Sequence, residues 1–256
     1  MRTQKIMILL FIFLFCFGTT VFAFEKGLVL YLKFDENEGD IAHDVSGNGN
    51  DSKINKTEWV KEGKFDSALM FTGELDSYVR INKSKSLVPE NQVTLEAWVF
   101  PTKVAGNNSI ISNTEAAGHT IRFENNKLKA YIHVDGAYAT PTGGPDIIPE
   151  KWYHTAVTFD GKVAKLYLDG QLIGEAERSG KITESTQDIF VGSETDANQP
   201  NQTYAFFGII DEVRIWQVAR TKDEIVRGME KPLSVTPEKH TAICWGDIKQ
   251  RNKPKN

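Results

Sequence analysis

Turn residues recur at short intervals along most of this chain, and that spacing limits the folds that it can adopt. Between Gly27 and Trp216, short runs rich in valine, isoleucine, phenylalanine, tyrosine and threonine alternate with glycine, asparagine, aspartate and proline. Before Arg220, no apolar pattern with the 3.6-residue period of a helix continues beyond about two turns. Many short strands joined by frequent turns predict an all-β protein, either a sandwich or a barrel.

Individual strands and hairpins can be assigned from these runs. The dipeptides Asp160-Gly161 and Asp169-Gly170 and the pair Asn125-Asn126 each separate two apolar runs, as two-residue hairpin turns do. Consecutive antiparallel hairpins therefore predict a meander over much of the sheet. The expected strands are Leu28–Phe34, Ala68–Phe71, Tyr78–Ile81, Val93–Phe100, Ser109–Ser112, Thr120–Glu124, Leu128–Val134, Tyr153–Phe159, Ala164–Leu168, Gln171–Glu175, Ile189–Val191 and Tyr204–Trp216.

One short helix is expected after the last strand, from Lys222 to about Met229. Thr221 is suited to the N-cap, and Glu224 follows three positions later, which is the capping-box pattern. Residues 232–256 are polar and basic, so we expect them to form an appended tail with little fixed structure.

The N-terminal residues 1–23 have the order of a secretory signal peptide, with a basic start, an apolar run and a small residue at the end. The apolar run is short for a membrane span, which needs about 20 residues, although an uncleaved anchor remains an alternative. We expect a secreted protein, extracellular or periplasmic, with no stable membrane insertion after cleavage. Loss of Arg2 and Lys5 would leave 28 basic residues against 34 acidic ones, which argues against nucleic acid as a partner. Only Cys244 would remain, so no intrachain disulfide is expected.

The segment FFGIIDEVRIW, residues 206–216, is apolar on both sides of the acidic pair Asp211-Glu212. A carboxylate within a buried strand is costly unless a cation or hydrogen bonds compensate it. The loop from Asp44 to Asn50 offers carboxylate, amide and backbone oxygens, which are the ligands that Ca²⁺ prefers. We therefore expect a calcium ion between Asp211 and this glycine–asparagine loop.

Two other interpretations of these residues stay open. The glycine–asparagine loop is also consistent with a simple turn organised by Asp44. Asp211 is equally suited to pair with Arg214 or to accept backbone N–H bonds. If the apolar residues on both sides of the acidic pair face the same core, a β-bulge is needed at the pair.

Four segments in order resemble the laminin-G-like domain of the concanavalin A-like lectin/glucanase superfamily, and they are LYLKFDENEGDIAHDVSGNGND, KEGKFDSALMFTGELDSYVRI, VTLEAWVFP with EKWYHTAVTFDGKVAKLYLDGQLIG, and FFGIIDEVRIWQVARTKDEI. The resemblance implies a jelly-roll sandwich of two antiparallel sheets over residues 24–231. It also implies a structural Ca²⁺ held by Asp35, Asn50 and Asp211, with backbone carbonyls completing the shell.

A catalytic role has little support in the sequence. Glucanases of this superfamily carry carboxylates at alternating positions of one strand, but Glu96 is followed there by Trp98 and Phe100. The lone His154 is more consistent with a structural residue than with a general base. We therefore expect no enzyme activity, and a glycoside hydrolase is the third alternative.

Binding is the expected function, and strand alternation predicts where. In the runs TIRFE and KLKAYIHV the aliphatic residues point to one face, which leaves Arg122, Tyr131 and His133 on the other. Tyr138 follows in the next short strand. Aromatic faces and polar groups together suit sugar rings, so these four residues are the candidate glycan site. An ordinary solvated face is the alternative interpretation, and adhesion to a cell-surface protein is the alternative function.

Overall fold

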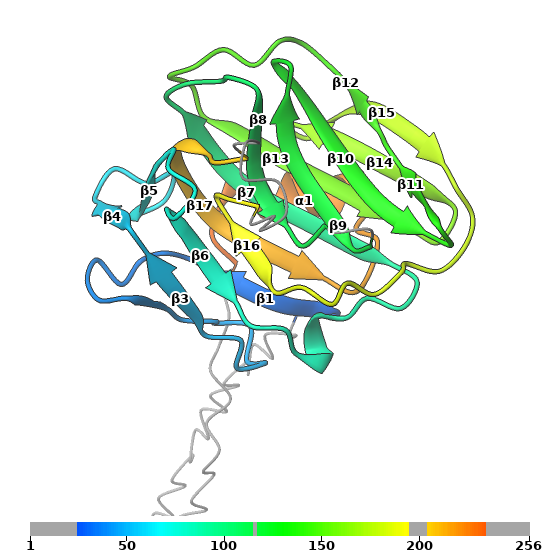
Figure 1. Cartoon of the computed structure of the whole chain (residues 1–256), viewed down its shortest axis with the longest axis horizontal. Helices are drawn as coiled ribbons and strands as arrows, with labels where there is room; N and C mark the ends of the chain where they lie inside the picture. Colours follow the sequence, from blue (N-terminus) through cyan, green and yellow to red (C-terminus); the bar gives the residue numbers. More distant parts are fainter. Residues whose placement is uncertain (1–24, 115–116, 195–203, 234–256) are drawn as a thin grey trace, which may run out of the picture.

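Two antiparallel sheets stacked face to face form the body of the protein (Figure 1). The computed structural model describes residues 25–114, 117–194 and 204–233. Within these residues the chain forms sheets of eight and nine strands and one α-helix, which confirms the predicted sandwich. The expected signal peptide, residues 1–23, lies outside the described residues, as do residues 234–256 of the expected tail.

The eight-stranded sheet has the order β15-β14-β13-β7-β17-β5-β4, and β1 also pairs with β17. Its strands are β1 (Leu28–Leu32), β4 (Thr57–Val60), β5 (Ala68–Thr72), β7 (Val93–Pro101), β13 (Tyr153–Phe159), β14 (Val163–Leu168), β15 (Gln171–Glu177) and β17 (Phe207–Trp216).

The nine-stranded sheet has the order β11-β10-β9-β8-β16-β6-β3-β2, and β12 pairs with β10. Its strands are β2 (Ile41–Ala42), β3 (Ser52–Asn55), β6 (Tyr78–Ile81), β8 (Asn107–Ser112), β9 (His119–Glu124), β10 (Lys127–Val134), β11 (Ala137–Ala139), β12 (Thr142–Gly143) and β16 (Ile189–Val191). A short 3-10 turn, η1 (Lys85–Leu87), follows β6.

The hairpin turns largely follow the sequence prediction. Asp169 and Gly170 have φ angles of 49° and 72°, and Asn125 and Asn126 have 52° and 62°. Two successive positive φ angles are what a type I′ hairpin turn requires. The connection at Asp160 differs, because β13 ends one residue before it and β14 begins only at Val163. There the Asp160 carboxylate accepts two backbone N–H bonds, at 2.9 and 2.8 Å, and organises a longer loop.

Strand alternation places the core between the sheets. On β9 and β10, the side chains of Ile121, Phe123, Ala130 and Ile132 are fully buried. They belong to one apolar cluster that includes residues of both sheets. The residues between them therefore lie on the outer face of the nine-stranded sheet.

Helix α1 (Lys222–Glu230) covers the outer face of the eight-stranded sheet, on the far side in Figure 1. Thr221 and Glu224 form the expected capping box. Ile225 packs against Ala156 of β13 and Tyr167 of β14. Among the described residues, no helix is both long enough and apolar enough to span a membrane.

Candidate functional site

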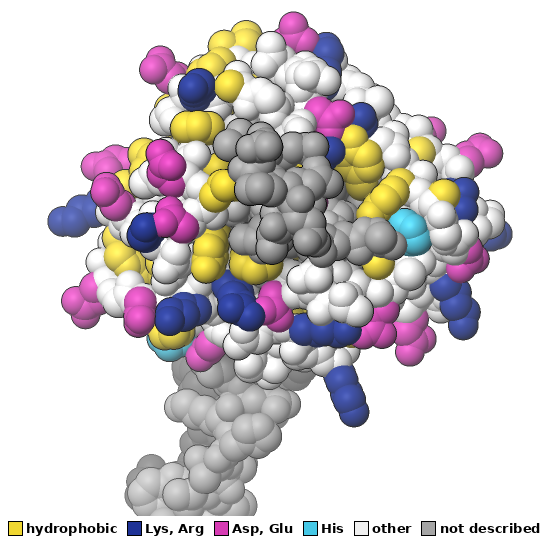
Figure 2. Space-filling model, in the orientation of Figure 1, with side chains coloured by type: hydrophobic (Ala, Val, Ile, Leu, Met, Phe, Trp, Pro, Cys, Tyr) yellow, Lys and Arg dark blue, Asp and Glu magenta, His cyan; other side chains and the backbone are white. Residues whose placement is uncertain are grey.

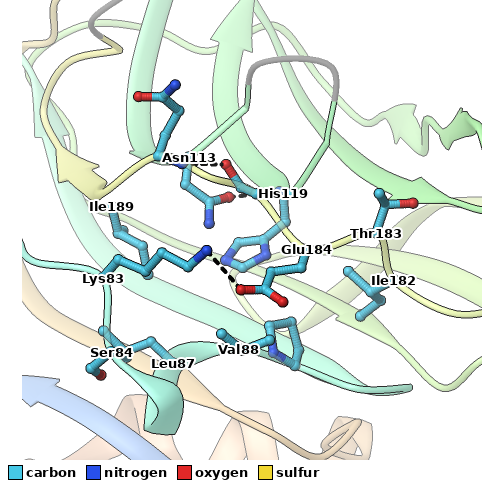
Figure 3. Close-up of a pocket in the computed structure, with 14 residues that line it drawn as sticks. Lys83, Ser84, Leu87, Val88, Asn113, His119, Ile182, Thr183, Glu184 and Ile189 are labelled. Atoms are coloured by element: carbon cyan, nitrogen blue, oxygen red, sulfur yellow. Dashed lines mark hydrogen bonds and ion pairs between the residues drawn. The ribbon is translucent and has the colours of Figure 1, made fainter.

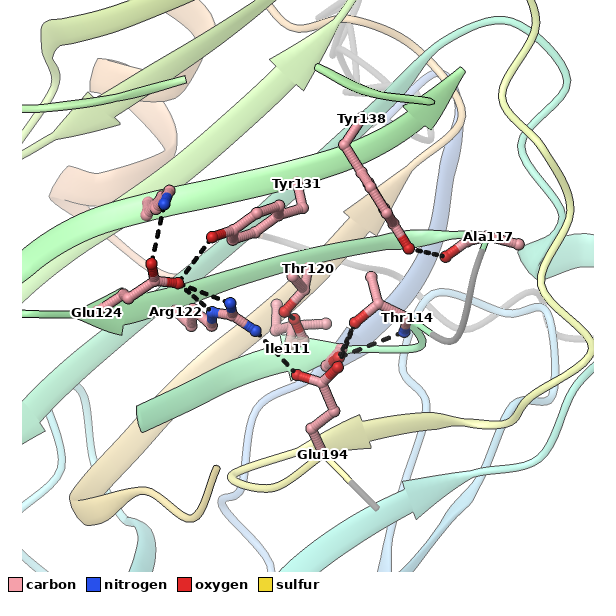
Figure 4. Close-up of polar contacts among 11 residues, drawn as sticks. Ile111, Thr114, Ala117, Thr120, Arg122, Glu124, Tyr131, Tyr138 and Glu194 are labelled. Atoms are coloured by element: carbon pink, nitrogen blue, oxygen red, sulfur yellow. Dashed lines mark hydrogen bonds and ion pairs between the residues drawn. The ribbon is translucent and has the colours of Figure 1, made fainter. Parts of the chain in front are cut away.

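The four residues predicted as a glycan site lie together on the outer face of the nine-stranded sheet. Figure 4 shows three of them, Arg122, Tyr131 and Tyr138. The guanidinium of Arg122 lies 4.4 Å from the ring centre of Tyr131. The rings of Tyr131 and Tyr138 are 5.8 Å apart, and those of His133 and Tyr138 are 4.7 Å apart, both edge to face. Strands β9, β10 and β11 are consecutive and antiparallel, and this pairing brings the side chains together.

Glu124 is a further member of this cluster. Its carboxylate accepts hydrogen bonds from Arg122 Nε at 3.1 Å and Nη2 at 2.6 Å. Lys129 Nζ donates at 2.9 Å and the Tyr131 hydroxyl at 2.7 Å. Burial acts to raise the pKa of Glu124, but the hydrogen bonds from Lys129, Tyr131 and Arg122 prevail and hold it at about 2. Glu124 is therefore an ionised group with fixed partners.

Glu194 completes the cluster from a distant part of the chain, just after β16. Its carboxylate lies 3.4 Å from Arg122 Nη1 and accepts a hydrogen bond from the Thr114 hydroxyl. Burial raises the pKa of Glu194, against the opposing effects of Thr114 and Arg122. Alternation in TIRFE already places Glu124 beside Arg122, but no local pattern indicates Glu194. We call the set Arg122, Glu124, Lys129, Tyr131, His133, Tyr138 and Glu194 the outer cluster.

The second candidate region is a corner of the eight-stranded sheet where β17 changes its neighbour. The first part of β17 pairs with β5, and the part after the acidic pair pairs with β1. Between the two parts, the register with β7 shifts by one residue and Glu212 adopts a φ of 54°. This is the β-bulge that burial of Ile210 and Val213 requires, so that prediction is confirmed.

Two carboxylates reach this corner. Asp211 is fully buried, and its oxygens accept the backbone N–H groups of Phe65 at 3.0 Å and Glu212 at 2.7 Å. Asp35 follows β1 and accepts the N–H of Ser67 at 3.4 Å. Both carboxylates therefore contact the same turn, residues 63–67. Burial raises the pKa of Asp211 to about 8, and the charges of Glu212 and Asp35 add to this effect.

The structure does not bring Asn50 to this corner. Its amide donates to the carbonyl of Val29 near the start of β1, at 2.8 Å, and accepts from the hydroxyl of Ser84 at 2.7 Å. The Asp44 carboxylate accepts the N–H groups of Tyr31 and Asn50, both at 3.0 Å, and so organises the loop. The glycine–asparagine loop is thus the Asp44-organised turn, and Asp211 contacts residues 63–67 instead.

The corner suits a hard cation better than a transition metal. The described residues contain no group of three or more His, Cys, Asp and Glu side chains that could hold a metal ion. Carboxylate oxygens are the donor type that calcium accepts, although Asp35 also pairs with Lys33 in this structure. Phe34, Asp66 and Glu212 have φ angles of 57°, 47° and 54°, so strained backbone gathers around the two carboxylates. Asp35 and Asp211 therefore fit a calcium ion, whereas Asn50 does not.

A third polar group is buried between the eight-stranded sheet and α1. Glu96 is fully buried and faces Arg214 Nη1 at 3.8 Å, Arg220 Nε at 3.6 Å and His154 Nε2 at 3.6 Å. Arg214 also pairs with Glu212 and donates to the carbonyl of Gly228 in α1 at 2.7 Å. Glu96 is thus enclosed by the guanidinium groups of Arg214 and Arg220 and by the ring of His154. We call Glu96, Glu212, Arg214 and Arg220 the buried cluster.

The end of the sandwich near η1 contains a small cavity (Figure 3). His119 forms part of its wall, and Lys83 and Glu184 pair at 2.7 Å across its lining. Burial lowers the pKa of His119 to about 4, so the imidazole is neutral. The cavity volume of about 20 Å³ accommodates roughly one water molecule. This cavity is too small for a sugar ring.

Comparison with known families decides the classification of the chain. Residues 72–226 match the model of Laminin_G_3, described as concanavalin A-like lectin/glucanases superfamily. The chain belongs to this superfamily. The resemblance stated from the four sequence segments is thereby confirmed.

The chain is similar in sequence to a small part of two much longer proteins. Pappalysin-1 of Homo sapiens is 27% identical over 225 residues, which is 73% of this chain and 13% of the relative. Pappalysin-1 of Mus musculus is 32% identical over 117 residues, which is 42% of this chain and 7% of the relative. The chain therefore spans between 7% and 13% of the length of these relatives.

Solved structures share the fold at low sequence identity. The binding domain of Paraclostridial Mosquitocidal Protein 1 has a TM-score of 0.66 and 18% identity, covering 79% of this chain and 52% of that one. The botulinum neurotoxin serotype G binding domain has a TM-score of 0.63 and 16% identity, covering 79% and 50%. Domain 4 of AbnA, a GH43 extracellular arabinanase from Geobacillus stearothermophilus in complex with arabinotriose, has a TM-score of 0.60 and 20% identity, covering 78% and 97%.

Proposed function

We propose that this superfamily member is an exported, noncatalytic module that recognises carbohydrate through the outer cluster. The observation that carries the proposal is the convergence of Arg122, Tyr131, His133 and Tyr138 on one outer sheet face. Tyr138 is 36% exposed, so part of its ring is available to a ligand. Aromatic rings stack on the apolar faces of sugars, and fixed polar groups bond the hydroxyls.

The rigidity of the cluster also supports recognition. Arg122 is held by Glu124, by Glu194 and by the ring of Tyr131, so its side chain has little freedom left to lose. A preorganised site binds more tightly because ordering it on association requires less free energy. The structural neighbours support this function, since one is an arabinanase domain in complex with arabinotriose and two are toxin binding domains.

A glycan array with the full chain tests this proposal. We expect binding to at least one oligosaccharide class, and Tyr138→Ala should lower the affinity about tenfold because it removes the exposed ring. Leu172→Ala is the matched control, because Leu172 is an exposed apolar residue, 44% exposed, on β15 of the other sheet. Absence of binding to every glycan would contradict the proposal and favour adhesion to a surface protein. Release of reducing sugar from a bound glycan would contradict the noncatalytic assignment.

We also propose that the corner at Asp211 holds a structural calcium ion. Asp35 and Asp211 would supply carboxylate oxygens, and the turn at residues 63–67 would supply backbone carbonyls. The bound ion would compensate the buried Asp211 carboxylate in an otherwise apolar strand, take the place of Lys33 beside Asp35, and tie β1, β5 and β17 together.

Thermal unfolding with calcium or with chelator tests the ion. Calcium at about 100 times its dissociation constant should stabilise the fold by about 2.7 kcal/mol. Asp211→Asn should remove the calcium-dependent part of the melting temperature, whereas Asn50→Ala should retain it, because Asn50 lies away from the corner. Equal melting curves with calcium and with chelator would overturn the proposal.

A further inference from the structure

The outer cluster also carries information about the charge of its ligand. We propose that it selects neutral oligosaccharides and rejects sulfated or carboxylated ones. This inference rests on the proposed carbohydrate function of the same site. It goes further because it names the chemical class of sugar that the site accepts.

The charges within the cluster are balanced. Arg122 and Lys129 contribute the positive charges, and Glu124 and Glu194 contribute the carboxyl groups. Lys129 and Arg122 both bond Glu124, and the second arm of Arg122 faces Glu194. His133 adds no charge at neutral pH, because burial and the nearby Arg178 lower its pKa. No cation of the cluster is therefore left without an acidic partner.

Three donor contacts of Arg122, the central cation of the cluster, are already made to carboxylates. The Nε and Nη2 groups of Arg122 both donate to the same oxygen, Oε2, of the Glu124 carboxylate. Its Nη1 group donates to Glu194 at 3.4 Å. A ligand sulfate or carboxylate at this arginine would have to displace one of these groups. It would then lie close to both glutamates, and like charges about 4 Å apart repel by about 4 kcal/mol at an effective dielectric constant of 20.

The surroundings of the cluster do not change this balance. At the far end of β10, Arg178 and Asp135 add one charge of each sign, and Arg178 donates to the carbonyls of Val134 and Asp135. Figure 2 shows acidic and basic side chains mixed around the edge of the same face, with neither sign gathered into one patch. A long-range field that would attract an anionic polymer is therefore missing from the visible face among the described residues.

A neutral sugar has suitable contacts in the same place. Tyr138 exposes part of its ring, and Tyr131 lies at 5.8 Å from it at a right angle. The hydroxyl of Tyr131 and the ammonium of Lys129 converge on Glu124 and are partly exposed at the surface. Such groups bond sugar hydroxyls without requiring a net ligand charge.

Titration calorimetry with matched oligosaccharide pairs tests the inference. Each pair consists of a neutral oligosaccharide identified on the array and the same backbone carrying sulfate or carboxylate groups. The full chain should bind the neutral member at least tenfold more tightly. Equal or tighter binding of the anionic member would overturn the selectivity and leave the proposed carbohydrate function standing. Failure to bind either member would overturn both.

Two charge-neutralising variants locate the selectivity. Glu194→Gln and Glu124→Gln should each raise the affinity for the anionic member by about tenfold, because each leaves Arg122 with an unbalanced positive charge. Glu184→Gln is the matched control, since it changes the net charge equally at an exposed pair with Lys83 outside the outer cluster. If Glu184→Gln raised the anion affinity as much as the cluster variants, overall charge would explain the effect and the inference would fail.

Discussion

The outer cluster and the buried cluster are built from the same parts on opposite faces of the sandwich. In each, an arginine lies between two glutamates and beside a tyrosine ring. Arg122 has Glu124, Glu194 and the ring of Tyr131 at 4.4 Å. Arg214 has the corresponding contacts to Glu212, Glu96 and the ring of Tyr31 at 4.9 Å.

The two clusters differ in what covers them. Helix α1 closes over Arg214, whose side chain is 1% exposed and bonds the helix carbonyl of Gly228. The side chain of Arg122 is 12% exposed and has no helix above it among the described residues. The same chemistry therefore joins two elements of the fold at one site and stays partly exposed at the other. The two arginines differ in what covers them and not in their partners.

The largest expected effect is on stability at the buried cluster. Arg214→Met should destabilise the fold by about 3–5 kcal/mol, because it leaves Glu96 and Glu212 buried without their cation. Urea unfolding followed by tryptophan fluorescence measures this. If Arg214→Met does not fold, Arg214→Lys provides the second test, since it keeps the charge and loses the bond to Gly228. An Arg214→Met variant as stable as the parent would contradict the distinction between the clusters.

The stability of the fold should depend on pH through His119, which lines the small cavity near η1. The folded chain keeps this imidazole neutral with a pKa of about 4, whereas the ordinary value is 6.5. The unfolded chain therefore takes up a proton first, and stability is lost as the pH falls from about 6.5 to 4. The loss should reach about 3 kcal/mol.

The difference in unfolding free energy between the wild type and a His119 variant isolates the contribution of this residue. Urea unfolding of the wild type and His119→Gln at several pH values should show the extra loss only in the wild type. The ion pair of Lys83 and Glu184 at the cavity is retained in both proteins and cancels in the comparison. Parallel pH profiles would show that His119 does not carry the effect.

Weakening helix α1, which covers the buried cluster, should lower the unfolding free energy by a smaller amount. Thr221→Ala removes the N-cap of α1 and should destabilise the protein by about 1 kcal/mol. Amide exchange should then accelerate in α1 and leave β9 and β10 unchanged, since the outer cluster has no contact with the helix cap. Faster exchange in both regions would mean that the two faces are not independent.

The smallest effect on stability is expected at the outer cluster itself. Arg122→Met should change the unfolding free energy by less than about 1 kcal/mol, because Glu124 keeps its bonds from Lys129 and Tyr131 and Glu194 keeps its bond from Thr114. The same variant should lower glycan affinity at least tenfold, because Tyr131 and Glu124 lose the guanidinium group that holds them in position. Unfolding and calorimetry on one sample measure both. A loss of stability equal to that of Arg214→Met would remove the contrast between the clusters.

Features that depend on neighbouring residues could be predicted from the sequence, whereas contacts between segments far apart in the chain could not. Alternation within consecutive hairpins placed Arg122, Tyr131 and His133 on one face, because neighbouring strands of a meander pair in a fixed register. Glu194 could not be predicted, since its contact with Arg122 joins segments far apart in the chain. Strands β3 and β4 were missed because their sequence, SKIN and TEWV, mixes polar residues into only partly buried edge regions.

The calcium corner shows a different limit of sequence reasoning. Aspartate and asparagine oxygens serve equally well as cation ligands and as acceptors within a turn. The family resemblance implied the first role for Asn50, and the structure shows its amide bonded to Val29 and Ser84. The turn at residues 63–67 contacts Asp35 and Asp211 and lies in one of the four segments of the resemblance, but nothing local in it indicates contact with these two distant carboxylates.

The bulge in β17 makes the chain tolerant of a deletion that would disrupt most strands. Because Glu212 is the one extra residue relative to β7, its removal would restore an unbroken ladder with Val213 and Ile215 still facing inward. A shortened protein lacking this glutamate should therefore retain its apolar interior, while Arg214 would lose the carboxylate that Tyr31 also bonds. The additional residue serves the polar groups outside the sheet, and the hydrophobic interior has no need of it.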